Sequence, residues 1–468
     1  MRLRLCNFAL CFSLIAIGLF TPVHAQGRYG GHSFSNFEPP VYSSPAQTTA
    51  SDPYQTDQQF SNESLVPYDA FTTYSAPNQG TQPASSFPGG LLRLNSTMTR
   101  PLLDFVNRQS EKELLLMSQG AAACNGPEIV VGAQFRASAM VGHTNSTNKF
   151  PYQGRFPGDF VGNTVTDARM LQANQAIVGH FTPWAHGYME TLFSDVFTFP
   201  TSTQGSFQMR QAYVTFGDLS QSPLYAWIGK KTVNFGDMGT LSPFSQSMVW
   251  HYFAPLAEGA GVGYSQNGLT VNLTALNGSR GIRVVDSEEK GHINNFAANM
   301  RYEMPLADNV TWAVGGGFLD GTIYNAAVAE HTNPNVIGPM NGAWDANTQL
   351  VLGPWIFEGE IAQTINPWPA TATDVTAWKA EAAHDLSWTG RPLRLSASYS
   401  EGTQGPAGSQ FEFNRQFVAG LRYVPHPNVT MSFEYVQSTG FAPLIDIITV
   451  SDRNVIQNSV ILGVVLAI

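Results

Sequence analysis

The side chains best suited to chemistry in this sequence are charged residues at every second position of otherwise apolar segments. Glu358 and Glu360 alternate with apolar or small residues, and Lys379 and Glu381 follow the same pattern further along. Successive side chains of a β-strand point to opposite faces, so each segment has one apolar and one charged face. A charged face that lines a water-filled pore sets the ion preference of that pore.

The candidate pore-lining residues lie on or next to such charged faces. They are Lys230, Lys231, Arg210, Arg136, Arg394, Arg422, Glu358 and Glu381. A second interpretation stays open, because charges of both signs are evenly mixed. Opposite charges can pair across neighbouring strands and simply hold a wall together.

Residue patterns typical of enzymes and metal sites are missing from the sequence. The ten histidines do not show a spacing such as His-x3-His, and we find no G-x-S-x-G turn and no phosphate-binding glycine loop. We therefore expect neither catalytic activity, nor a metal, nor a cofactor. An enzyme built into a barrel is the minor alternative.

The elements that must position these charges are about sixteen alternating segments. Their centres lie near Phe135, Ala173, Thr191, Ala212, Ile228, Gly263, Val271, Ala298, Val314, Thr348, Glu358, Lys379, Leu395, Ala419, Phe433 and Val464. Short turns alternate with longer loops between them, as periplasmic turns and extracellular loops do in outer-membrane barrels. This rhythm predicts an all-β, transmembrane antiparallel barrel over residues 125–468, with both termini in the periplasm.

Composition agrees with this fold class. Only 12% of the residues are charged, about half of the usual share for a globular domain. Beyond the N-terminus, no stretch approaches the roughly 18 apolar residues of a membrane helix. A large soluble all-β protein is the alternative. The net charge of −10 argues against nucleic acid as a partner.

The N-terminal part of the chain reads as three different segments. Residues 1–25 have the basic start, apolar run and small-residue ending of a secretory signal peptide, which removes two of the three cysteines. Residues 26–98 are polar and aperiodic, which predicts a disordered periplasmic linker. Residues 99–120 predict one short helix, capped by Thr99, that packs at the periplasmic rim or forms a coiled coil.

One long loop, residues 236–258, is the third on the extracellular side by strand counting. It contains Phe244, Trp250, His251 and Tyr252, which suit a loop packed against an inner wall better than one extended into water. We expect this loop to fold into the lumen and constrict it. Lys230 and Lys231 lie at its root and are the best candidates to contact an anionic solute.

The stretch from Phe207 to Gly278 resembles the bacterial siderophore-porin family of the legiobactin-receptor type, and more distantly the phosphate-selective porins. The similarity lies in Arg210–Phe216, in Ile228–Gly236 and in Leu276–Gly278. Two positions depart from the family: Asn234 stands where proline is usual, and Ile468 replaces the usual terminal aromatic residue. The resemblance implies a sixteen-stranded outer-membrane porin that passes ferric siderophore without a plug.

The combined interpretation is a Gram-negative outer-membrane porin that passes small solutes, ferric siderophores among them, by plug-free facilitated diffusion through a loop-constricted lumen. The alternatives are a general diffusion porin and a structural or adhesive surface barrel. The expected partners are outer-membrane lipid, a small anionic or iron-chelate solute and the barrel-assembly machinery. A homotrimer is one alternative for the assembly.

Overall fold

The computed structural model describes residues 92–106, 110–123, 127–151, 161–194, 198–199, 202–203, 207–277, 292–326, 338–409, 412–441 and 452–468. The predicted signal peptide and most of the predicted linker therefore lie outside the described residues. Among the described residues, no helix is both long enough and apolar enough to cross a membrane.

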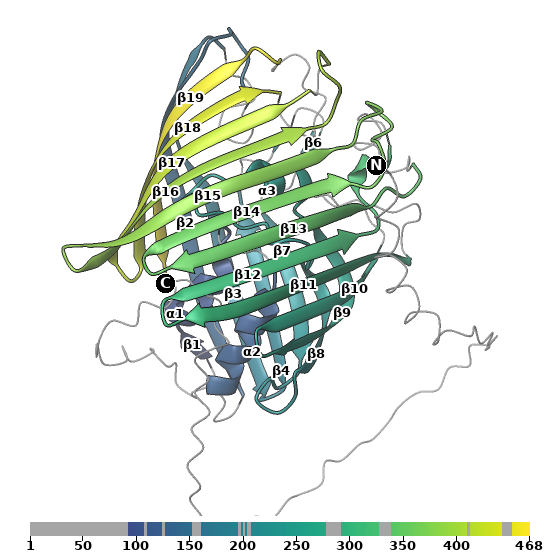
Figure 1. The fold of residues 1–468 in the computed structure, drawn as a ribbon. Coiled ribbons are helices and arrows are strands. Elements are labelled where there is room, and N and C mark those ends of the chain that lie inside the picture. Colours follow the sequence, from purple (N-terminus) through teal and green to yellow (C-terminus); the bar gives the residue numbers. More distant parts are fainter. Residues whose placement is uncertain are drawn as a thin grey trace, which may run out of the picture. The chain divides into compact units, whose positions relative to one another are not determined.

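Sixteen long strands form one closed antiparallel barrel (Figure 1). They are β2 (Glu128–Thr144), β3 (Thr164–Thr182), β4 (Ala185–Phe193), β7 (Phe207–Phe216), β8 (Leu224–Thr232), β9 (Leu256–Gln266), β10 (Leu269–Asn277), β11 (Ile293–Ala307), β12 (Val310–Leu319), β13 (Ala343–Leu352), β14 (Trp355–Thr364), β15 (Thr376–Trp388), β16 (Arg391–Thr403), β17 (Asn414–His426), β18 (Val429–Gly440) and β19 (Ile456–Ala467). The last strand pairs with β2, for example Val460 with Val141, and this pairing closes the barrel. The predicted sixteen-stranded barrel is confirmed, and each predicted centre lies in its own strand.

The two faces of the wall follow the sequence alternation. In β19, Val460, Leu462 and Leu466 are exposed on the outside, whereas Ile461 and Ala467 are buried on the inside. The inner face carries most of the charged residues of the wall, and many of them are less than 9% exposed. The lumen is therefore filled around these charges.

Short and long connections separate to opposite ends of the barrel. Seven tight turns join strand pairs at one end, among them the predicted Asn267-Gly268 turn, where both residues have positive φ. Eight longer connections lie at the other end. One of these, between β4 and β7, was missed in the sequence, and it carries the short strands β5 (Thr198–Phe199) and β6 (Ser202–Thr203).

The N-terminal segment, residues 92–123, differs from the prediction of one helix after a disordered linker. β1 (Leu92–Leu94) pairs parallel with β2, and α1 (Ser96–Leu103) and α2 (Lys112–Ala123) follow. Asn95 caps α1 in place of the predicted Thr99, by accepting hydrogen bonds from the backbone of the first turn. Asp104 ends α1 because its carboxylate accepts the Val106 N–H at 3.0 Å, a local bond that competes with the helix.

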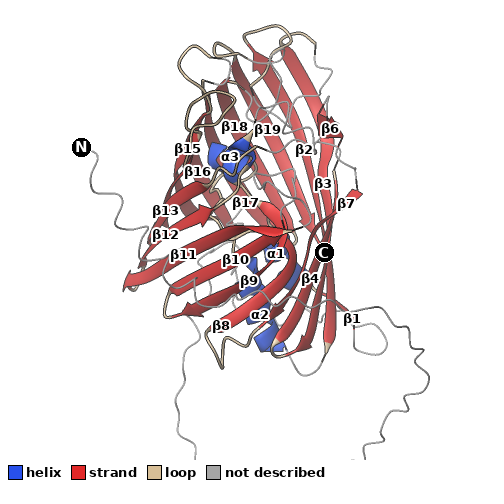
Figure 2. Cartoon of the chain, turned by 90° about the vertical axis from the view of Figure 1, so that its right-hand side faces the viewer, coloured by secondary structure: helices blue, strands red, loops and turns tan. Residues whose placement is uncertain are grey.

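Helices α1 and α2 lie inside the barrel, near the end with the short turns (Figure 2). Leu102, Leu103 and Leu116 form a buried cluster with inward-facing residues of β2, β3, β4 and β7, such as Tyr188 and Tyr213. In place of the single predicted helix at the rim, two helices therefore pack against the inner face of the wall. The sequence could not show this, because an apolar helix face packs equally well against a rim, a partner helix or a lumen wall.

Candidate functional site

The candidate site is a constriction in the lumen, built by the loop between β8 and β9. This constriction loop, residues 233–255, carries the short helix α3 (Met248–Phe253), which Ser247 caps. Figure 2 shows α3 within the barrel, and nearly all the loop's residues are buried. The predicted inward fold of this loop is thus present, with the strand boundaries at Thr232 and Leu256.

Three glutamates of the wall hold the backbone of the constriction loop. Glu360 accepts the N–H groups of Asp237 and Met238 at 2.8 and 3.0 Å. Glu381 accepts the Thr240 hydroxyl at 2.6 Å and the Leu241 N–H at 2.9 Å. A carboxylate offers two acceptor oxygens, so each glutamate can hold two or more donors of an irregular loop.

Glu434 makes the third and most extensive of these contacts. It accepts the N–H groups of Phe244 and Ser245 at 2.6 and 2.9 Å, and the Ser245 hydroxyl at 2.6 Å. Hydrogen bonds to an ionised acceptor are about twice as strong as neutral ones. Because β14, β15 and β18 supply the three glutamates, the loop is fixed along one wall of the barrel.

Lys379 completes this wall of charges. Its Nζ donates to the Gly239 carbonyl at 2.6 Å and lies 3.4 Å from carboxylate oxygens of both Glu358 and Glu360. Glu381 is 3.6 Å away. One cation thus offsets part of the repulsion among three buried carboxylates.

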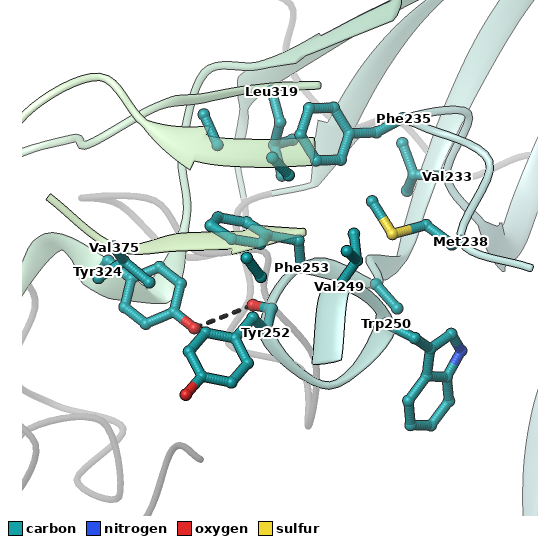
Figure 3. Close-up of a cluster of buried hydrophobic side chains, with 14 of the residues drawn as sticks. Val233, Phe235, Met238, Val249, Trp250, Tyr252, Phe253, Leu319, Tyr324 and Val375 are labelled. Atoms are coloured by element: carbon teal, nitrogen blue, oxygen red, sulfur yellow. Dashed lines mark hydrogen bonds between the residues drawn. The ribbon is translucent and has the colours of Figure 1, made fainter. Parts of the chain in front are cut away.

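Apolar packing seals the other side of the loop. Val233, Phe235, Val249 and Phe253 are buried together with Tyr324 from a neighbouring long connection (Figure 3). The Tyr324 hydroxyl donates to the Tyr252 carbonyl at 3.0 Å.

Several wall positions facing the loop are glycines, where the loop approaches the backbone closely. A Cβ at Gly402 would collide with the Tyr252 ring, and one at Gly463 would collide with the Phe244 ring. These glycines make room for loop side chains, and sequence patterning alone did not identify them.

The N-terminal segment contacts the constriction loop on the side that faces the short turns. The Thr240 N–H donates to the Val106 carbonyl at 2.7 Å, and the Gln246 amide donates to the Phe105 carbonyl. Arg136 lies between the Phe105 and Phe244 rings, 3.5 and 4.3 Å from their centroids. This is the cation–π geometry, and it joins both elements to β2.

The two lysines at the root of the loop have different environments. Lys231 is 1% exposed and faces inward, where its Nζ contacts the Glu113 carboxylate of α2 at 2.6 Å. Lys230 pairs in register with the outward-facing Ala212, and its amino group donates to the Met209 carbonyl. Successive side chains of a strand point to opposite faces, so Lys230 faces outward because its neighbour Lys231 faces inward. Lys230 is therefore not brought to the lumen.

The other candidate residues occupy the lumen as predicted but in paired form. Arg210 lies 3.2 Å from Glu190, Arg394 lies 2.6 Å from Asp385, and Arg422 lies 3.6 Å from Asp104. The first two pairs join neighbouring strands, as the second interpretation of the charges proposed. Sequence analysis missed Asp104 and Glu113, the acidic partners on the N-terminal segment. Nothing in the residue spacing indicated that α1 and α2 enter the lumen.

Burial shifts the titration of the N-terminal segment. The ammonium group of Lys112 donates to the carbonyls of Leu102 and Asp104, and burial lowers its pKa to about 8 although the Asp104 charge opposes the shift. For Asp104, burial would raise the pKa of the carboxyl, but Arg422 and Lys112 outweigh this and lower it. Among the described residues, no group of three histidine, cysteine or acidic side chains is arranged to hold a metal ion.

Comparison with known proteins returns solved structures only. No protein-family model matches the chain, and no curated protein matches its sequence. Similar solved structures include the outer-membrane channel DcaP of Acinetobacter baumannii, with 12% identity, a TM-score of 0.47, and 74% of this chain and 99% of that chain covered. The anion-selective porin from Comamonas acidovorans has 9% identity, a TM-score of 0.49, and 73% and 100% coverage. The OmpF complex with daunomycin from Salmonella typhi has 12% identity, a TM-score of 0.49, and 73% and 98% coverage.

Proposed function

We propose that this protein is an outer-membrane channel of Gram-negative bacteria that passes small anionic solutes through a lumen narrowed by the constriction loop. The membrane location is supported by the closed barrel, which leaves no unpaired sheet edge, and by the apolar outer face. In this proposal the short turns and the N-terminal segment face the periplasm. The long connections face outside.

The observation that carries the proposal is the attachment of the constriction loop by Glu360, Glu381 and Glu434. Seven hydrogen bonds from the loop to these three carboxylates hold an irregular backbone inside the lumen. A structural or adhesive surface barrel does not need a loop that narrows its lumen, whereas a selective channel does. The proposed preference for anions rests on inward-facing Arg136, Lys231 and Arg422, of which the last two are paired with Glu113 and Asp104 of the N-terminal segment.

The preference for ferric siderophores is a finer proposal, supported by the resemblance of residues 207–278 alone. Uptake of radiolabelled iron as a siderophore complex, compared between cells with and without this protein, tests it. A general diffusion porin is the second candidate function, and it would show equal permeation of anions and cations of one size. Assembly as a homotrimer is likewise a proposal, tested by cross-linking in native membranes.

Single-channel recording of the purified full chain in planar bilayers tests the main proposal. Glu434→Ala removes the acceptor of three donors, and each donor left unsatisfied costs about 1–3 kcal/mol. We expect a larger conductance and a weaker anion preference. Glu412→Ala is the matched control, because Glu412 pairs with the half-exposed Arg453 on the long-connection side. A folded Glu434→Ala barrel with unchanged currents would refute the constriction.

A further inference from the structure

A cavity of about 80 Å³ lies beside α1, at the end of the barrel with the short turns. Its walls come from α1, from the start of β16, from β17 and from the turn that joins β17 to β18. One ordered water needs roughly 10–15 Å³ of such space, and a drug-sized ligand needs about 300–1,000 Å³. The cavity therefore has room for a small ion or a single functional group, but not for a bulky molecule.

The cavity carries more positive than negative charge. Arg100 of α1 and Arg391 of β16 line it, together with the carboxylate of Asp104. Asp104 lies 3.6 Å from the Arg422 guanidinium of β17, so a third arginine offsets this carboxylate. We therefore expect a positive potential inside the cavity, which favours an anion.

The two arginines that line the cavity differ in how they are held. The Arg100 guanidinium donates to the Pro427 carbonyl and, at 2.6 Å, to the Thr430 hydroxyl, and both acceptors are uncharged. Arg391, in contrast, has no hydrogen-bond or ion-pair partner within the described part of the chain. The N–H donors of a guanidinium form a planar fork that can bind two oxygens of one carboxylate or sulfate group.

The same cavity also offers a neutral donor. The Ser96 hydroxyl donates to the Asn428 Oδ1 at 3.0 Å, a bond that orients the amide and leaves its N–H groups for a ligand. The backbone N–H groups at the start of α1 do not contribute, because the Asn95 side chain already accepts those of Thr97 and Met98. The cavity thus combines a free guanidinium with an oriented amide.

We propose that this cavity binds one oxyanionic group, a carboxylate or a sulfate, between Arg391 and Asn428. Both residues line this one small cavity, so a single small ion reaches both. The inference rests on the proposed function, because it assigns the place where an anionic solute is bound at the short-turn end of the lumen. The size of the cavity restricts the solute class to small organic acids and inorganic oxyanions.

Binding of radiolabelled sulfate to the purified full chain, measured by equilibrium dialysis at constant ionic strength in chloride, tests the site. We expect saturable binding of one sulfate per chain. Arg391→Gln removes the charge and the fork, and it should weaken this binding by roughly tenfold, which corresponds to about 1.4 kcal/mol. Arg391→Lys keeps the charge without the fork and should weaken binding less than Arg391→Gln does. The control Arg453→Gln should bind sulfate as the unmodified protein does, since Arg453 pairs with Glu412 on the long-connection side.

Competition shows which anions the site accepts. Acetate should displace sulfate, because a carboxylate presents the same pair of oxygens to the guanidinium fork, whereas added chloride at equal ionic strength should not. Absence of saturable sulfate binding, failure of acetate to compete, or equal sulfate binding in a folded Arg391→Gln barrel would overturn the inference. A barrel that binds sulfate through Arg391 but carries no anion current in planar bilayers would instead overturn the channel proposal and leave the site standing.

Discussion

At the scale of residues, the lumen uses its charges to hold internal elements in place. Glu360, Glu381 and Glu434 bind loop backbone, and Lys231 binds a helix side chain. A buried charge without a partner costs several kcal/mol, so pairing explains why charged residues can fill the interior. The same pairing joins Lys231 at the end of β8 to Glu113 of α2 inside the lumen.

Lys112 gives a prediction at this scale. Its pKa is about 8 in the folded chain and 10.5 for an ordinary lysine. Between these pH values the unfolded chain holds a proton that the folded chain has lost, so the free energy of unfolding rises as pH increases from about 8 to 10.5. Below pH 8 both states are protonated, and the cost of the buried charge is fully present.

Thermal unfolding at pH 7 and pH 9 measures this effect. The melting temperature of the unmodified protein, relative to that of Lys112→Met, should rise by a few degrees between the two pH values. Methionine preserves the length of the side chain and cannot titrate, so groups elsewhere cancel in the comparison. A constant difference between the two proteins would show that Lys112 titrates normally.

At the scale of elements, the constriction loop is a compact unit that fits a matching wall. α3 presents Met248, Val249 and Phe253 to an apolar cluster, while the residues before it bind the glutamates. Wall glycines such as Gly402 leave space for the loop's rings. Loop and wall are therefore complementary in shape as well as in charge, and the fit depends on single methyl groups.

A methyl group at Gly402 tests this fit. Gly402→Ala should push the Tyr252 ring away, because overpacking of a dense interior costs about 1–3 kcal/mol. We expect larger and noisier single-channel currents in a barrel that still folds. Gly359→Ala is the matched control, since a Cβ there meets its neighbours only at ordinary contact distances. If both variants conduct alike, the ring of Tyr252 does not limit the passage.

At the scale of the whole molecule, the outer face must satisfy a lipid environment. Leu462 is 56% exposed near the middle of β19, whereas Asn458 lies on the same face nearer to the long connections. The cost of a charge facing lipid depends on depth and reaches about 2–4 kcal/mol at the midplane.

Two arginine variants of β19 test this face. Leu462→Arg should impair assembly, seen as loss of the heat-modifiable folded band on gels, and Asn458→Arg should assemble almost normally. Equal yields of both folded variants would contradict a lipid-facing outer surface.

Orientation in the membrane belongs to the same scale. Asn267 is exposed in a short turn, and Ala407 is exposed in a long connection at the opposite end of the barrel. A membrane-impermeant maleimide added to intact cells should label Ala407→Cys and leave Asn267→Cys unlabelled until the cells are opened. Labelling of Asn267→Cys in intact cells would reverse the proposed orientation.

The sequence by itself determined the barrel, because period-two alternation, turn residues and chain length are local properties. Strands such as β14 and β15 show their inward charges directly in the order of their residues. The inward fold of the constriction loop could also be predicted from the sequence. The loop is rich in aromatic residues, and strand counting makes it the third long connection of the barrel. Lys230 was misplaced because two neighbouring residues of a strand cannot both face the lumen, and Lys231 takes the inward position.

Only the tertiary structure decided what fills the lumen. Glu113 is separated from Lys231 by 118 positions in the sequence, and Glu434 from Phe244 by 190 positions. Such contacts depend on closure of the barrel, which brings strands from both ends of the chain around one interior. The apolar side chains of α1 and α2 show that these helices need an apolar surface to pack against. They do not show which surface that is. The closed wall selects that surface, because its inward side chains match the helices in shape and in charge.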